Sequence, residues 1–461
     1  MVIEGALTKS LVLEAADACG QGVNLRYRLG IHVFHTRIVY ESVDFPNLRD
    51  RYGTLVDSVV AHIALFEGMK YCSLFPAEFD VSLCADYLPP DAEELFREIY
   101  RKVFAQHKWE HNNPRYDGPA LRANWSQDSE PGNISATSGL LLSCGGGKDS
   151  LASMRLLETA GIPYDVSQYS HSIYGPAAPQ HDLINALVAR CGPGKAHRMD
   201  VEDDFLSGEI LKHPDFAGIV KTLCAPETPC SVFEALPLAL MHNYENFAVG
   251  HERDADTGSF HWSDIDDDVN HQWGKSYQAE ELLTQYVQTN LVKNFSYFSL
   301  LKQIYDFLIF QFLRAYPEDI PFTHSCNIEK PWCRRCAKCV YVWLGFTAYL
   351  DGPMPFAENL FDVAEVQDIL AELTGLAGHR PFECVGEVDH ARLACYFAWR
   401  KGRSGAFLQY FAEKAIPSMN SADLLRKYGH VHPDGHAVPE PLSALITPVL
   451  LAAGHSVVLP D

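Results

Sequence analysis

The sequence predicts an α/β protein in which a parallel sheet is flanked by helices, with an α+β domain before it and a mostly helical part after it. Two observations lead to this class. Between residues 139 and 250, short apolar segments of strand length alternate with longer segments whose apolar residues recur at helical spacing. This alternation is typical of parallel strands joined by crossover helices. After residue 277 the helical spacing dominates.

We expect four parts along the chain. Residues 1–117 form an N-terminal α+β domain, because 24–40 alternates between apolar and polar residues as strands do, while 52–69 and 91–107 have apolar residues at helical spacing. The other parts are a linker rich in Gly, Pro, Ser and Asn at 118–138, the α/β domain at 139–276, and the helical C-terminal part at 277–461.

Within the α/β domain, strands and helices are expected in strict alternation. The strands are 140–143, 164–169, 196–201 and 247–250, and the helices are 150–160, 180–190 and 232–244. The C-terminal helices are expected at 277–288, 299–315, 340–350 and 363–373. Ligands of open parallel sheets bind at the carboxyl ends of the strands, so the segments that follow the strands are the first candidates for a site.

Composition restricts the class of function. The 461 residues carry 37 basic and 59 acidic side chains, a formal net charge of −22, which argues against a nucleic-acid partner. Apolar runs are too short to span a membrane, and the first residues lack the pattern of a signal peptide. We therefore expect a cytoplasmic protein without a membrane partner, in which most of the 13 cysteines are thiols or metal ligands. Oligomeric state stays open.

The stretch Ser-Cys-Gly-Gly-Gly-Lys-Asp-Ser at 143–150 lies between an expected strand and an expected helix. Glycines let backbone N–H groups approach phosphate closely, and the helix N-terminus adds its positive dipole end. A carboxylate beside phosphates indicates Mg²⁺ or a role in orienting the loop. The alternative is a glycine-rich turn without a ligand. The residues predicted to bind a phosphate-bearing cofactor are Ser143, Gly145, Gly146, Gly147, Lys148, Asp149 and Ser150.

Four cysteines follow the pattern C-x6-C-x2-C-x2-C, at Cys326, Cys333, Cys336 and Cys339. Thiolates at such spacing are typical of a structural zinc site. An iron–sulfur cluster could use the same ligands, and a group of free thiols at the start of a helix is the alternative without metal.

Two further polar segments are candidates for chemistry. Residues 250–277 carry His251, Arg253, His271 and Lys275 after the fourth expected strand, a mixture suited to an anionic substrate and proton transfer. The segment 378–387, which contains Cys384, is dense in polar groups and flanked by glycines, and it could close over the site. Solvated loops are the alternative interpretation of both segments.

The glycine stretch resembles the pyrophosphatase loop of the PP-loop ATPases, also called adenine nucleotide alpha hydrolases, whose pattern is S-G-G-x-D-S. Gly145 stands where that pattern begins with Ser, so the loop is a variant. The Walker pattern does not fit, because Asp149 follows the lysine. The resemblance implies a PP-loop (HUP-like) sheet that binds ATP, cleaves it between the α- and β-phosphates and adenylates an acid.

The order of five segments is similar to one PP-loop subfamily, the MurL-type epimerases. The segments are 144–150, 251–254, 269–277, 332–341 and 383–387. This similarity implies an ATP- and Mg²⁺-dependent isomerase of peptidoglycan synthesis, active on UDP-N-acetylmuramoyl-L-alanyl-L-glutamate. It would invert the terminal L-glutamate to D-glutamate through an acyl-adenylate and release AMP and pyrophosphate.

Residue roles follow from the resemblance as hypotheses. Asp149 would place Mg²⁺ or the loop, and Arg253 and Lys275 would bind the carboxylates or diphosphate of the substrate. The catalytic candidates are His251, His271, Lys275, Cys384 and Asp149; the choice of the acid/base pair among His251, His271 and Cys384 stays open. The rival functions are a tRNA-modifying or sulfur-transferring PP-loop enzyme, an ATP-dependent amide- or nitrile-forming ligase, and a non-catalytic zinc-bearing scaffold.

Overall fold

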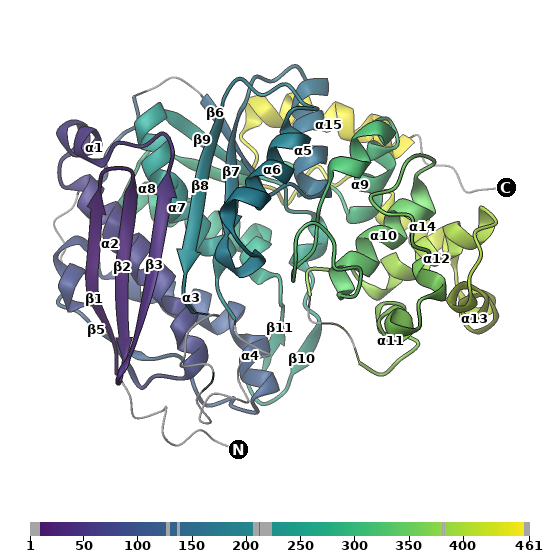
Figure 1. The fold of residues 1–461 in the computed structure, drawn as a ribbon, viewed down its shortest axis with the longest axis horizontal. Helices are drawn as coiled ribbons and strands as arrows, with labels where there is room; N and C mark the ends of the chain where they lie inside the picture. Colours follow the sequence, from purple (N-terminus) through teal and green to yellow (C-terminus); the bar gives the residue numbers. More distant parts are fainter. Residues whose placement is uncertain are drawn as a thin grey trace.

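One ten-stranded sheet runs through the computed structural model, in the order β12-β9-β6-β7-β8-β3-β2-β1-β4-β5 (Figure 1). The structure describes residues 10–125, 130–135, 139–205, 212, 224–379, 381 and 383–455. Most of the predicted linker lies within these described residues. Its residues 126–129 and 136–138 lie outside them.

The first five strands in that order run parallel to their neighbours. They are β6 (Gly139–Cys144), β7 (Asp165–His171), β8 (Ala196–Asp203), β9 (Tyr244–Val249) and β12 (Ser296–Ser299). The helices that connect or follow them are α5 (Lys148–Thr159), α6 (Ala177–Val188), α7 (Glu227–His242) and α8 (Tyr277–Asn290). The predicted parallel sheet flanked by helices is confirmed.

Both faces of this parallel part are covered. Along β6, Leu140 and Leu142 belong to one buried core and Leu141 to another, as expected when successive side chains point to opposite faces. The first core contains α5 and the C-terminal helices, and the second contains α7 and α8. Strands buried on both faces are near-continuous apolar runs, which explains the Leu-Leu-Leu sequence of β6.

The N-terminal strands extend the same sheet. They are β1 (Ser10–Cys19), β2 (Gly22–Leu29), β3 (His32–Tyr40), β4 (Glu78–Asp80) and β5 (Ala120–Arg122). β3 pairs antiparallel with β8, where Tyr40 lies opposite Met199. The helices of this region are α1 (Phe45–Tyr52), α2 (Leu55–Glu67), α3 (Asp91–Val103) and α4 (Ala105–Glu110). The four-part division of the chain stays a prediction, and its first and third parts share one sheet.

The C-terminal part is mostly helical, as predicted (Figure 1). Its helices are α9 (Asp306–Leu313), α10 (Ala337–Tyr349), α11 (Gln367–Leu373), α12 (Val388–Arg400), α13 (Ala406–Lys414), α14 (Ser421–Tyr428) and α15 (Glu440–His455). Helix α10 packs on α12, and α15 packs against α9 and α5. The expected helix at 299–315 was wrong at its start, since Ser299 ends strand β12.

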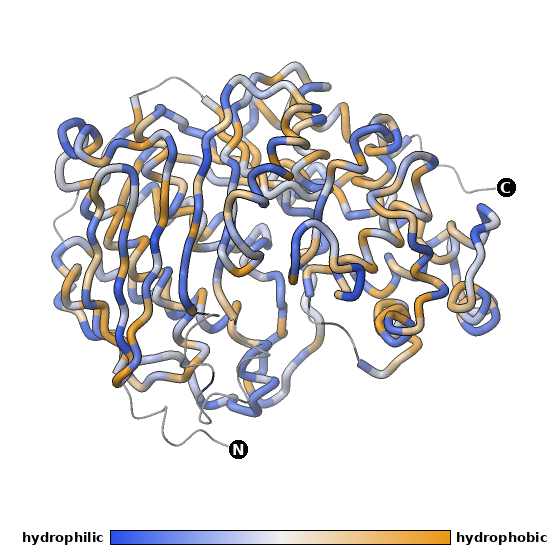
Figure 2. The backbone as a smooth tube through the Cα atoms, viewed as in Figure 1, coloured by the Kyte–Doolittle hydropathy of each residue, from blue (hydrophilic) through white to orange (hydrophobic). Residues whose placement is uncertain are grey.

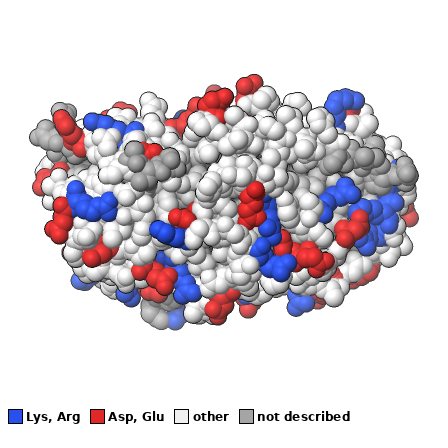
Figure 3. All heavy atoms as spheres, turned by 90° about the horizontal axis from the view of Figure 1, so that it is seen from above, with Lys and Arg blue, Asp and Glu red and all other residues white. Residues whose placement is uncertain are grey.

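Among the described helices, none combines the length and the apolar character needed to cross a membrane. Figure 2 shows hydrophobic stretches interrupted by hydrophilic ones along the trace. On the face in Figure 3, acidic and basic side chains are interspersed. The predicted lack of a nucleic-acid partner stays a prediction.

Candidate active site

A cavity of about 580 Å³ lies at the carboxyl ends of the parallel strands. Its walls include Ser143 from β6, His171 from β7, Asp203 from β8 and Val249 from β9. This is the position that the topology of a parallel sheet favours for a ligand. Further lining residues come from the C-terminal part, namely from residues 323–339 around the four cysteines (the cysteine segment) and from Cys384.

The glycine stretch forms the turn between β6 and α5. Gly147 precedes the first residue of α5 with extended backbone, so the N-terminus of the helix is directed at the loop. Gly146 has a φ of +82°, which favours glycine, and a Cβ there would lie 2.0 Å from Nε2 of His324. The loop residues that line the cavity are Ser143, Gly145, Gly147, Asp149 and Ser150. Backbone N–H groups at such a turn are suited to an anion.

Lys148 lies beneath the loop and is fully buried. Its Nζ is 2.5 Å from Oδ1 of Asp149 and 2.5 Å from Oδ1 of Asp306. Burial opposes the charge, but these two carboxylates outweigh it and raise the pKa of Lys148. Neither Lys148 nor Gly146 is among the described residues that line the cavity. The predicted contact of Lys148 with phosphate therefore stays a prediction.

Three carboxylates, from Asp149, Glu252 and Asp306, place one oxygen each within 4.8 Å of one another. Burial alone would raise the pKa of Glu252, but Lys148, Lys338 and Lys275 lower it to about 2. Asp149 and Glu252 line the cavity, whereas Asp306 bonds to Lys148 outside its lining. Carboxylate oxygens are the ligands that Mg²⁺ prefers, so Asp149 and Glu252 fit that ion. Glu252 was not among the predicted site residues, although it directly follows His251, three residues after the end of β9.

Lys275 and Cys384 meet in the cavity wall. Nζ of Lys275, in the 3₁₀ helix η7 (Trp273–Lys275), donates a hydrogen bond to Sγ of Cys384 at 3.1 Å. Burial opposes ionisation of Cys384, but the Lys275 ammonium and a hydrogen bond from His271 outweigh it and lower the pKa of the thiol to about 5. At neutral pH the cavity therefore holds a thiolate, a group that can accept a proton.

Lys302 holds the backbone of the polar segment 250–277 at two points. It is fully buried, and its Nζ donates to the backbone oxygens of Glu252 at 2.9 Å and Lys275 at 2.6 Å. One buried ammonium thus fixes the backbone that carries the carboxylate and the backbone that carries the partner of the thiolate. No local pattern in the sequence indicates this role of Lys302.

The remaining predicted residues divide into two groups. His251 and His271 line the cavity with Lys275 and Cys384. Nδ1 of His251 is 3.8 Å from Oε1 of the buried Glu280, and burial lowers the pKa of His251. Arg253 lies elsewhere: its Nη1 donates to the backbone oxygen of Asp434 at 3.3 Å, and it is not among the described residues of the cavity lining.

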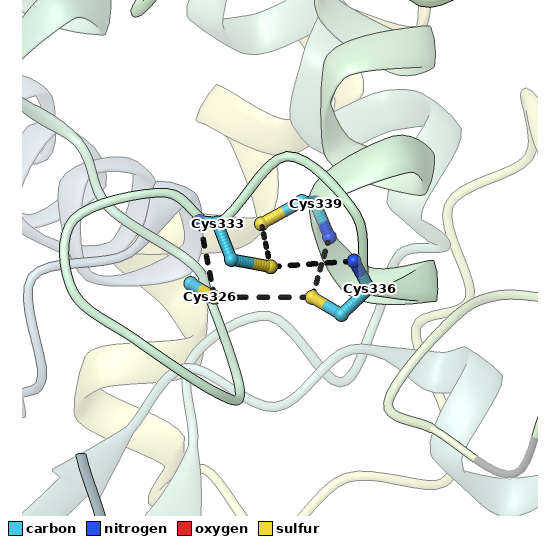
Figure 4. Close-up of side chains that lie close together, drawn as sticks. All are labelled: Cys326, Cys333, Cys336 and Cys339. Atoms are coloured by element: carbon cyan, nitrogen blue, oxygen red, sulfur yellow. Dashed lines mark hydrogen bonds between the residues drawn. The ribbon is translucent and has the colours of Figure 1, made fainter. Parts of the chain in front are cut away.

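The four predicted metal ligands come together at the start of α10. Their sulfur atoms lie within 4.8 Å of one another and face a common centre (Figure 4). Sγ of Cys326 accepts backbone N–H groups of Ile328, Glu329 and Cys333 at 3.2–3.4 Å. Thiolates are good acceptors for such bonds, and four sulfurs around one centre fit Zn²⁺. The structure supports a metal-binding cluster here.

The cysteine segment also lines the cavity, a proximity that was not predicted from the sequence. Its residues in the lining are His324, Ser325, Asn327, Lys330 and Lys338. Glu383 connects this segment to Cys384, because its carboxylate accepts the N–H groups of Ala337 at 3.1 Å and Lys338 at 3.0 Å. The cysteine pattern was visible in the sequence, but its proximity to the glycine loop depends on the fold.

Comparisons with known proteins point to one family. A family model described as the MurL N-terminal domain matches residues 10–175 and 226–300, and one described as the MurL C-terminal domain matches residues 321–422. Three similar curated proteins each bear the name UDP-N-acetyl-alpha-D-muramoyl-L-alanyl-L-glutamate epimerase.

The relative from Xanthomonas oryzae pv. oryzae is 28% identical over 62% of this chain and 62% of its own length. The one from a Micromonospora species is 27% identical over 55% of each chain. The one from Salinispora tropica is 27% identical over 67% of this chain and 66% of its own. The chain thus matches between about half and two thirds of the length of these relatives.

Proposed function

The chain belongs to the MurL family, and from that premise we propose that it inverts the terminal L-glutamate of UDP-N-acetylmuramoyl-L-alanyl-L-glutamate in an ATP-dependent reaction. The observation that carries the proposal is a single cavity lined by both the glycine loop and Cys384. Such a cavity can hold a nucleotide beside a group that accepts a proton.

Activation of the substrate explains why both halves are needed. The α-proton beside a free carboxylate is very weakly acidic, because its removal places two negative charges on neighbouring atoms. In the proposed reaction a carboxylate oxygen of the terminal glutamate attacks the α-phosphorus of ATP. The bond between the α-phosphorus and the bridging oxygen breaks, and pyrophosphate leaves. The resulting mixed anhydride has no charge on the acyl group and can stabilise an adjacent carbanion.

The loop and the acidic pair would hold the nucleotide. The phosphates of ATP fit the backbone N–H groups at the N-terminus of α5. Asp149 and Glu252 would hold Mg²⁺, which supplies positive charge to the phosphates when bound. In this proposal the glycine loop binds the phosphates of ATP as a PP-loop does.

Cys384 is the group best prepared to remove the α-proton. As a thiolate paired with Lys275 it accepts the proton from one face of the α-carbon, and a protonated group on the other face returns one. His251 and His271 are the candidates for that second role, since both line the cavity. Hydrolysis of the anhydride then gives AMP and the free D-glutamate carboxylate.

The direct test combines the protein with ATP, Mg²⁺ and the L,L-dipeptide nucleotide. We expect AMP, pyrophosphate and D-glutamate to form together, measured by chromatography and by chiral analysis after acid hydrolysis. Absence of both AMP and D-glutamate would rule out the epimerase. AMP that forms only when ammonia is added would indicate an amide-forming ligase, and ATP binding without AMP from this acid would favour a non-catalytic scaffold.

A further inference from the structure

His324 occupies an unusual position in the cavity wall. Its side chain is almost fully buried, with 1% of the residue surface exposed, yet it lines the cavity beside Gly145 and Gly147. Its backbone N–H donates to the oxygen of Gly146 at 2.9 Å. The imidazole ring fills the space that a Cβ of Gly146 would take. The ring is therefore fixed directly against the predicted phosphate loop.

Neither ring nitrogen of His324 has a hydrogen-bond partner in the described part of the chain. A buried polar atom without a partner costs about 1–3 kcal/mol, so folded proteins leave few of them. A neutral imidazole has one N–H donor and one acceptor nitrogen. A ligand in the cavity that accepts a hydrogen bond would satisfy the donor. The ligand expected at the N-terminus of α5 is an anion, which is such an acceptor.

Contacts within the cysteine segment fix the residues on either side of His324. Two residues after His324, Cys326 enters the cluster and accepts three backbone N–H groups. One residue before it, the oxygen of Thr323 accepts a hydrogen bond from Nε1 of Trp332 at 3.0 Å. Lys330 and Lys338 of the same segment also line the cavity and bring positive charge to this wall.

We propose that His324 donates a hydrogen bond to the polyphosphate tail of ATP, and that the cysteine cluster presents it to the glycine loop. The proposal rests on the proposed use of ATP and adds a binding residue to it. The anion is then held between two walls, the N-terminus of α5 on one side and the cysteine segment on the other. This arrangement also explains why the loop has glycine at position 146.

The test is isothermal titration calorimetry on the full-length, metal-loaded protein with MgATP, pyrophosphate and AMP as separate ligands. His324→Phe keeps a ring in place and removes the donor, whereas His324→Gln keeps a donor. We expect His324→Phe to weaken binding of MgATP and pyrophosphate about tenfold, which corresponds to the loss of one hydrogen bond to a charged group. AMP affinity should change less than twofold, and His324→Gln should recover part of the loss. His261→Gln, at the exposed position of strand β10 (Phe260–Trp262), is the control.

Each outcome is decisive. Wild-type affinity for pyrophosphate in His324→Phe would overturn the proposal, and so would an equal loss for AMP and pyrophosphate. If the wild type binds neither MgATP nor pyrophosphate, the proposed function itself fails.

Metal content and melting temperature are measured for every variant. If His324→Phe loses metal or does not fold, ¹⁵N spectra of the wild-type histidine rings decide. The ring signal of His324 is identified by its absence from the His324→Gln spectrum. Movement of this signal on addition of pyrophosphate supports the proposal, and no movement contradicts it.

Discussion

At the scale of single residues, the site depends on charges that burial alone would suppress. Lys275 and Cys384 are 109 residues apart in the chain, and their contact lowers the pKa of the thiol against the effect of burial. Both were predicted as site residues from their polar neighbourhoods. A polar neighbourhood in the sequence does not tell in which direction a side chain points. Arg253 was therefore predicted together with the other site residues, although its side chain bonds to Asp434 outside the cavity lining.

The Lys275–Cys384 pair predicts a pH dependence. The reactive form is the thiolate, so the rate of alkylation of Cys384 by iodoacetamide should rise with pH through about 5 and change little above pH 7. Lys275→Met removes the ammonium that stabilises the thiolate, so the pKa rises and the midpoint moves to higher pH. Peptide mapping by mass spectrometry follows Cys384 separately from the other thiols. Lys195→Met, at an exposed position, should leave the midpoint unchanged, and an equal shift in both variants would contradict this account.

Lys148 predicts an effect on stability. It is the shared partner of Asp149 and Asp306, so Lys148→Met leaves a buried carboxylate without its ammonium. Removing one partner of a buried ion pair costs roughly 3–5 kcal/mol. Urea unfolding should show a decrease of this order in the free energy of unfolding, and Asp306→Asn in the same chain should restore part of it. No change in stability would mean that Lys148 is not held by this pair.

At the scale of elements, α10 and the cysteine segment before it connect the metal cluster to the cavity. Helix α10 begins at Ala337, and Glu383 caps it by accepting the N–H groups of Ala337 and Lys338. The pattern of cysteines identified the cluster from the sequence, because ligand spacing is local. Strand β12 was missed because four residues are too few to establish a period of two.

The cluster predicts a bound metal and a defined consequence of its removal. We expect one Zn²⁺ per chain by elemental analysis, and Co²⁺ substitution should give the absorption of tetrahedral thiolate ligation. Cys336→Ser should lose the metal and lower the melting temperature, while Cys191→Ser, outside the cluster, should retain it. Iron and sulfide in the purified protein would instead indicate an iron–sulfur cluster.

At the scale of the whole molecule, one sheet brings the N-terminal strands and the glycine loop into one body. The parallel half could be predicted, because alternating strands and helices leave a periodic signal in the sequence. The pairing of β3 with β8 could not be predicted, since it joins residues as far apart in the chain as Tyr40 and Met199 by backbone hydrogen bonds that leave no local pattern. The cavity arises where this sheet meets the C-terminal helices, and the polar segments meet there for the same reason.

In the proposed reaction, the glycine loop and Cys384 serve successive steps in one cavity. The most direct measurement is the effect of Cys384→Ala on two products in the same mixture of ATP, Mg²⁺ and the L,L-dipeptide nucleotide. We predict that AMP and pyrophosphate still form. The rates of D-glutamate formation and, in deuterated water, of deuterium incorporation at the α-carbon should fall at least a hundredfold, which is the rate contribution typical of a general base. D-glutamate formed at the wild-type rate by Cys384→Ala would contradict the account.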